Sequence, residues 1–205
     1  MTANAELQIA DLRRRLLGGY QLLQALVGIR LRSVTDPESR RHMTWLSDVT
    51  AAMTLLNRRI SDEGPVDFAA YLDDAAGFWR RSVEDRGIRI DVRAAEAPVA
   101  ETQALPLAII VHELVSNAVR HAFPDGAHPG SGRGSIAIAY SLASGGVSLV
   151  VRDSGVGAES LTPGDGLALV EGLVEHLGGQ MSIETAPGAG VGVRVRLPLT
   201  SDAVH

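Results

Sequence analysis

Apolar side chains recur at three- and four-residue steps along residues 6–61, the spacing that places them on one face of an α-helix. The first periodic run extends over residues 12–31 and the second over residues 42–60. Between the two runs, Asp36 is a candidate N-cap for a helix with Pro37 at its first position. The pattern therefore predicts two amphipathic helices joined by a short turn.

A single helical hairpin buries its apolar stripe poorly. Two copies packed together form a four-helix bundle, so the pattern predicts a homodimer through residues 6–61. The alternative is that the hairpin packs only on the remainder of its own chain. Gly18-Gly19 lies inside the first helix, where it marks a kink, a close helix–helix contact or a boundary between two shorter helices.

Gly64-Pro65 breaks the helical pattern and marks a domain boundary, with residues 1–63 before it, a second domain over 64–200 and a frayed tail over 201–205. Alternation between helical and strand patterns follows. Helices are expected over 68–83, 106–122 and 167–177, and strands over 88–92, 136–140, 147–151, 181–184 and 191–197. Two strand pairs joined by glycine-rich turns, with helices interleaved, predict an α+β fold with helices on one face of a mostly antiparallel sheet.

Composition removes several kinds of chemistry. All 19 basic residues are arginine, which excludes a P-loop and any catalytic lysine. Cysteine is absent, which excludes thiol nucleophiles, disulfides and cysteine-based zinc sites. The net charge of −5 argues against nucleic-acid binding. We expect no membrane insertion and a cytoplasmic location, because no uninterrupted apolar run approaches the length of a membrane span and the N-terminus does not read as a secretory signal.

Three segments of the second domain carry candidate chemistry. In the helix that contains His112–Ala122, the side chains of Glu113, Asn117 and Arg120 share one face. Carboxylate and amide oxygens suit Mg²⁺, and a guanidinium pairs with phosphate. Taken alone, such a polar stripe is typical of a solvated helix face.

The other two segments are rich in glycine. Asp153-Ser154-Gly155-Val156-Gly157 follows an apolar strand, so its carboxylate is placed to accept a hydrogen bond from an exocyclic amine such as adenine N6. Gly164-Asp165-Gly166 opens a helix, where free N–H groups can face an anion. Either segment alone also fits an ordinary turn or helix cap.

In this order and spacing, the three segments resemble the N, G1 and G2 boxes of the ATP-binding domain of histidine kinases, within the GHKL superfamily. The resemblance covers residues 100–199, and the ending Leu177-Gly178-Gly179-Gln180 to Leu197-Pro198-Leu199 is similar to the family's closing strands. His112-Glu113-Leu114 is similar to the opening of the N box in the HWE subfamily. The resemblance implies a GHKL, or Bergerat-type, α/β sandwich that binds ATP and Mg²⁺.

The resemblance also implies roles for individual residues. Asn117 would bind Mg²⁺, Glu113 would act as general base or order a metal-bound water, and Arg120 would contact phosphate. His121 is expected near the nucleotide, and Asp153 would read adenine. The pocket and its lid would be shaped by four glycines: Gly155, Gly157, Gly164 and Gly166. The lid between Gly157 and Gly164 is short. Asp165 would repel phosphate if its side chain pointed inward.

The hairpin departs from the family pattern at the expected phosphoacceptor histidine. Arg14 falls where that histidine is expected, and the first helix contains no histidine. A guanidinium cannot replace an imidazole in this role, because it stays protonated and is not a nucleophile. His42 on the second helix is a weak candidate acceptor, so the acceptor is left unknown.

Three functions fit these observations. The first is a histidine-kinase-type phosphotransferase of a two-component system, which acts on a histidine of a partner or on His42. The second is a non-enzymatic dimeric scaffold or pseudokinase that docks a response regulator or a partner kinase. The third is an anti-sigma-type serine kinase on the same ATP-binding fold, a family that does not need the helical hairpin.

Overall fold

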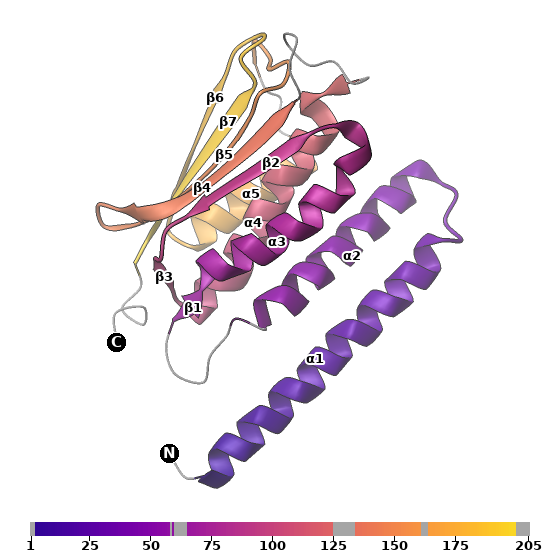
Figure 1. Ribbon diagram of the computed structural model, residues 1–205, viewed down its shortest axis with the longest axis vertical. Helices are drawn as coiled ribbons and strands as arrows, with labels where there is room; N and C mark the ends of the chain where they lie inside the picture. Colours follow the sequence, from indigo (N-terminus) through magenta and orange to yellow (C-terminus); the bar gives the residue numbers. More distant parts are fainter. Residues whose placement is uncertain (1–2, 58, 60–64, 125–133, 161–163, 200–205) are drawn as a thin grey trace. The chain divides into compact units, whose positions relative to one another are not determined.

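The computed structural model describes residues 3–57, 59, 65–124, 134–160 and 164–199 (Figure 1). The chain divides into two compact units, Met1–Arg58 and Arg59–His205. The expected tail, 201–205, lies outside the described residues, as does Gly64 at the expected domain boundary.

The first unit consists of two helices, α1 (Ala3–Leu31) and α2 (Pro37–Asn57), that pack against each other. The predicted cap of α2 is confirmed, because the Ser39 amide donates to Asp36 Oδ2 at 2.7 Å. Hydrogen bonding from Ser39 lowers the pKa of Asp36. Helix α1 continues without a break through Gly18-Gly19, so the interpretation of that pair as a helix boundary is wrong. A Cβ added at either glycine would meet no atom of the described chain within 4 Å.

Helix α1 leaves a set of large apolar side chains in solvent. Each of these residues is between 45% and 62% exposed: Leu16, Leu22, Leu23, Leu26 and Ile29. A helix that is apolar beyond the face it buries is typical of a bundle with further partners.

The second unit contains the remaining elements. Its longer helices are α3 (Phe68–Ser82), α4 (Glu101–Asn117) and α5 (Asp165–His176). Two short helical turns are η1 (Glu84–Arg86) and η2 (Ala118–Ala122). The strands are β1 (Val66–Asp67), β2 (Arg89–Ala94), β3 (Pro98–Val99), β4 (Ser135–Ala143), β5 (Gly146–Asp153), β6 (Gln180–Thr185) and β7 (Val191–Pro198).

Five strands form one mixed sheet in the order β2-β4-β5-β7-β6. Only the β2–β4 pair is parallel, and the other three pairs are antiparallel. Figure 1 shows α3, α4 and α5 on one face of this sheet. The predicted α+β class, with helices on one side of a mostly antiparallel sheet, is therefore confirmed.

The core lies between the sheet and these helices. The Phe68 ring lies 5.0 Å from the Tyr71 ring and 5.2 Å from the Tyr140 ring, measured between centroids. Burial raises the pKa of both tyrosines well above the ordinary value. Gln103 is also buried, and its side chain donates to the Pro198 carbonyl at 3.0 Å, which fixes the start of α4 against the end of β7.

Two details of α4 differ from the sequence prediction. The helix begins at Glu101 rather than at Pro106, so the proline lies inside its second turn and not at its first position. The segment that follows Asn117 is a π-helical turn, η2, rather than a continuation of the α-helix. Turns of this kind are rare and occur frequently at functional sites.

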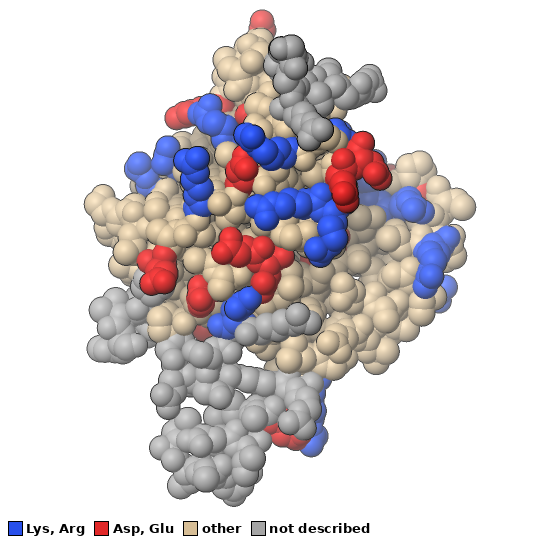
Figure 2. Space-filling view, in the orientation of Figure 1, with Lys and Arg blue, Asp and Glu red and all other residues tan. Residues whose placement is uncertain are grey.

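One segment of the described chain, Glu101–Ala122, is long and apolar enough to cross a membrane by length and composition alone. Its most apolar stretch is 61% buried inside the protein, as is usual for a core helix. On the face of the molecule in Figure 2, basic and acidic side chains are interleaved rather than gathered by sign.

Candidate functional site

The end of α4 and the turn η2 bring three of the predicted site residues together. Glu113 is 1% exposed, and its Oε1 has no hydrogen-bond partner in the described part of the chain. Its other oxygen, Oε2, lies 3.9 Å from Arg120 Nη2. The same Arg120 nitrogen donates to Asn117 Oδ1 at 3.1 Å. A carboxylate, an amide and a guanidinium therefore form one cluster, which the helical spacing predicted.

The start of α5 lies directly against this cluster. A Cβ added at Gly166 would lie 2.8 Å from Glu113 Oε2 and 3.4 Å from the Asn117 amide atoms. Gly164 precedes the helix, and its carbonyl accepts from the Leu167 and Ala168 amides at 3.0 Å. Asp165 is exposed in the first turn of α5. Only a residue without a side chain fits at position 166 without displacing the buried carboxylate.

Asp153 ends strand β5 and is 6% exposed. Its Oδ1 accepts from the Gly155 amide at 2.8 Å and from the Val191 amide at 3.2 Å. Burial raises the pKa of this carboxyl, although both amide hydrogen bonds act in the opposite direction. Two backbone N–H groups thus hold the carboxyl at a buried position where its negative charge is unfavourable. A further hydrogen bond from a ligand donor would stabilise that charge.

Close backbone contacts explain two of the predicted glycines. A Cβ at Gly155 would lie 2.2 Å from the Ala122 carbonyl oxygen, and one at Gly157 would lie 2.0 Å from the Ala186 carbonyl oxygen. The Val156 amide donates to the same Ala122 carbonyl at 3.0 Å. The segment after β5 is therefore joined to the end of η2, which links Asp153 to the cluster around Glu113.

The remaining predicted residues lie outside these contacts. His121 is exposed on η2. His42 is exposed on α2 in the first unit. Arg14 lies on α1, where the structure describes its backbone position but not its side chain.

Two residues that organise this region belong to none of the predicted motifs. Thr185 Oγ1 accepts from the Ala158 amide at 3.0 Å and lies 3.2 Å from the Gly190 carbonyl, so it ties the segment after Gly157 to the turn before β7. Arg86 on η1 donates to the backbone of η2 and of the residue after it. Neither residue belongs to a periodic pattern or a motif, and the partners Ala158, Val119 and Phe123 lie 27 or more positions away in the sequence.

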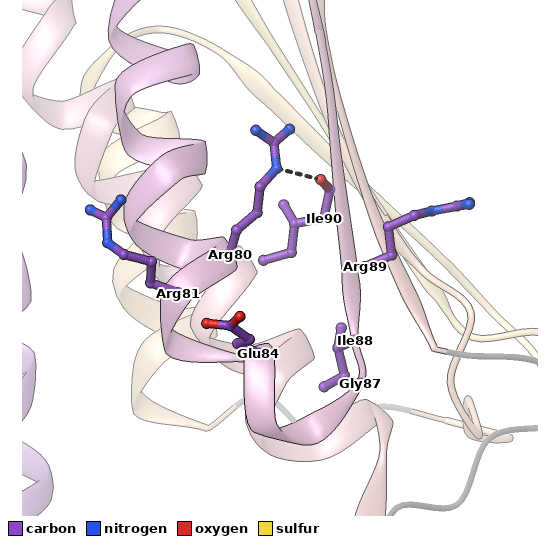
Figure 3. A pocket seen from close by; sticks show the side chains of 7 residues that line it. All are labelled: Arg80, Arg81, Glu84, Gly87, Ile88, Arg89 and Ile90. Atoms are coloured by element: carbon purple, nitrogen blue, oxygen red, sulfur yellow. Dashed lines mark hydrogen bonds between the residues drawn. The ribbon is translucent and has the colours of Figure 1, made fainter.

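A groove of about 630 Å³ lies elsewhere on the second unit, between the end of α3, η1 and the start of β2 (Figure 3). Arg80 reaches across it and donates from Nε to the Ile90 carbonyl at 3.0 Å. None of the predicted nucleotide-binding residues lines this groove.

Residues 102–201 match the family described as histidine kinase-, DNA gyrase B-, and HSP90-like ATPase. The sensor histidine kinase PdtaS of Mycobacterium tuberculosis is 27% identical over 207 aligned positions, which cover 93% of this chain. The chain spans 39% of the length of that relative.

Solved histidine kinase structures share the fold. The histidine kinase domain of the Erythrobacter litoralis EL346 blue-light activated histidine kinase has a TM-score of 0.68 at 21% identity, over 90% of this chain and 98% of the other. A second structure of that kinase has a TM-score of 0.70 at 23% identity, over 94% and 62%. Full-length ShkA in complex with AMPPNP has a TM-score of 0.52 at 19% identity, over 95% and 47%.

The matched residues 102–201 contain every element of the cluster, from Glu113 to Gly166, and the structural likeness extends over most of the chain. Residues 102–201 therefore match an ATPase domain of the histidine kinase-, DNA gyrase B- and HSP90-like family, and most of the chain shares the fold of solved histidine kinase structures.

Proposed function

We propose that this chain is a histidine-kinase-like signalling protein of a two-component system that binds Mg-ATP at the site formed by η2, the segment after β5 and the start of α5. The first unit, by this proposal, forms a homodimer through residues 6–61 and docks a response regulator or a partner kinase. The membership of residues 102–201 in an ATPase family supports nucleotide binding.

The observation that carries the proposal is the state of Glu113. A carboxylate that is 1% exposed, with one oxygen unpartnered among the described residues, is costly for the fold on its own. Proteins retain such groups where a ligand or a proton-transfer step uses them. The neighbouring Asn117 and Arg120 supply the oxygen donor and the cation that a metal–phosphate group needs.

These residues divide the work of binding. Asn117 would hold Mg²⁺ through Oδ1, and phosphate and water oxygens would supply further ligands, because no three His, Asp or Glu side chains gather in the part of the chain that the structure describes. The metal, when bound, neutralises phosphate charge. Arg120 would then exchange its hydrogen bond to Asn117 for a phosphate oxygen, and Asp153 would accept from the exocyclic amine of adenine.

The remaining residues have proposed roles in catalysis and in shaping the pocket. Glu113 would take a proton from an incoming acceptor or order a water near the phosphates. Gly155, Gly157, Gly164 and Gly166 would shape the pocket and its lid, and His121, exposed on η2, would lie beside the nucleotide.

The exposed apolar side chains of α1 support the proposed dimer. Five of them are at least 45% exposed, and burying this face against a second copy removes their apolar surface from water.

A second candidate is a scaffold or pseudokinase in which nucleotide only shifts a conformational equilibrium. The observation that favours it is Arg14, which stands where the resembled family carries its phosphoacceptor histidine. Intact buried Glu113 favours the phosphotransferase instead, because a nucleotide-regulated scaffold has no need of a base.

Calorimetric titration of Mg-ATP into wild type and Asp153→Ala, followed by incubation with γ-labelled ATP, tests these alternatives. Binding that Asp153→Ala abolishes, together with acid-labile label on the protein, supports the phosphotransferase. His42→Ala then removes the label if His42 is the acceptor, and Glu113→Gln retains binding while losing label. Binding without label on the chain or on any partner supports the scaffold. Absence of binding contradicts the nucleotide proposal.

A further inference from the structure

The π-helical turn η2 carries Arg120 and His121, two of the residues proposed to contact nucleotide. Helix ends leave backbone carbonyls without partners inside the helix, so the position of such a turn depends on what those carbonyls contact. In η2 these contacts come from two separate segments of the chain.

One contact comes from the side of the proposed pocket. The Ala122 carbonyl accepts from the Val156 amide at 3.0 Å, and the Gly155 backbone lies directly against the same group. This side of the turn therefore depends on the glycine-rich segment after β5.

The other contact comes from Arg86, which lies outside all three motifs. Its Nη1 donates to the Val119 carbonyl, and its Nη2 donates to the Phe123 carbonyl at 3.2 Å. The two carbonyls are one turn apart, so the planar guanidinium spans them with separate N–H groups. Lysine has a single ammonium and no fork, so it would hold one carbonyl well and not both.

Arg86 is itself fixed by its own turn. It ends η1, which Gly87 closes in a left-handed conformation with φ of 64°, and the Gly87 amide donates to the Glu84 carbonyl at 3.2 Å. Glu84 and Gly87 line the groove in Figure 3, whose opposite wall includes β2. Arg86 thus connects the end of α3 and this groove to the turn that bears Arg120.

We infer that Arg86 is a positioning residue for the nucleotide site, which holds η2 so that Arg120 faces the phosphates of ATP and His121 lies beside the nucleotide. It touches neither nucleotide nor metal and acts only through the backbone of η2. The inference rests on the proposed function for the identity of the ligand, and on the geometry alone for the restraint of η2.

Hydrogen exchange of the nucleotide-free 205-residue chain tests the restraint. We expect Arg86→Ala to raise amide exchange across residues 118–124 by about tenfold, with α4 before Asn117 still protected, and Arg86→Lys to be intermediate. The matched control is Arg89→Ala, since Arg89 pairs with Asp91 rather than with the η2 backbone. Wild-type exchange at 118–124 in Arg86→Ala, or a uniform rise throughout the domain, would overturn the inference.

Calorimetry with two ligands then separates positioning from general weakening of the fold. We expect Arg86→Ala to weaken Mg-ATP about fivefold and adenosine less than twofold, because adenosine has no phosphate for Arg120 to contact. Equal weakening of both, or of neither, overturns the positioning role. If wild type binds neither ligand, the proposed function fails and the nucleotide role of Arg86 fails with it, whatever the exchange of η2 shows.

Discussion

Replacing Asp153 with asparagine tests whether this carboxylate recognises the adenine base. The substitution keeps the size and shape of the side chain, and the amide oxygen can still accept from Gly155 and Val191 as Oδ1 does now. The second oxygen becomes an NH₂ group. The asparagine NH₂ group would then face the adenine amine, and two hydrogen-bond donors cannot bond to each other.

The expected loss follows from this exchange. A hydrogen bond to a charged group contributes about 1.5–3 kcal/mol, and about 1.4 kcal/mol corresponds to a tenfold change in affinity. Asp153→Asn should therefore weaken Mg-ATP by about 10- to 150-fold. Because burial already penalises the charge of Asp153, the neutral amide should not destabilise the fold.

Inosine triphosphate makes the test specific, since its O6 accepts where the adenine amine donates. The preference for ATP over ITP should fall by at least about tenfold in the variant, because the new NH₂ can donate to O6. Isothermal titration of both nucleotides, with Asp91→Asn as a control for loss of one negative charge, measures this. ATP binding by Asp153→Asn within twofold of wild type, or equal weakening of both nucleotides, would refute the reasoning.

Three further predictions concern the fold, the protonation of Asp153 and the assembly. Gly155→Ala would place a Cβ 2.2 Å from the Ala122 carbonyl oxygen, so calorimetric unfolding should show a loss of about 1–3 kcal/mol. Gly164→Ala, whose added Cβ would meet no atom of the described residues within 4 Å, should unfold near wild type. The pKa of Asp153 is raised in the folded state, so its ionised form destabilises the fold. In urea unfolding, the stability of wild type relative to Asp153→Asn should therefore fall as pH rises above 3.8. A difference in unfolding free energy that does not change with pH would contradict this. Leu26→Asp on α1 should convert a dimer to a monomer by light scattering, whereas Leu142→Asp, at an exposed leucine of β4, should leave the mass unchanged.

The sequence was most informative where a local rule decides the structure. The hairpin between β4 and β5 turns at Gly145, whose φ of 81° suits glycine, and the glycine-rich turn between two strand-like segments predicted this hairpin. The cap at Asp36 is equally local. A local rule failed at Pro106, since proline is common at a first helical position but α4 begins earlier, at Glu101. The buried Gln103 side chain donates to the Pro198 carbonyl and holds this earlier start.

Contacts between distant parts of the chain were beyond such rules. Arg86 meets the carbonyls of Val119 and Phe123, and Thr185 meets Ala158, across separations that no periodicity reports. The short pair β1 and β3 was missed because two residues carry no alternation. Spacing did predict that Glu113, Asn117 and Arg120 share a helix face, but only the packing of Gly166 explains why the carboxylate is buried.

The glycines of the motifs have a steric reason that is separate from catalysis. Gly155 makes room for Ala122 and Gly166 makes room for Glu113, and Gly190, with φ of 72°, lies against the backbone and side chain of Asp153. These contacts join backbone segments around one pocket, and they would be needed by any protein that folds this pocket, with or without phosphoryl transfer. The glycine motifs are therefore evidence for the nucleotide site and say nothing of the acceptor. Evidence for transfer must come from Glu113, whose Oε1 has no hydrogen-bond partner among the described residues, and from the fate of the γ-phosphate.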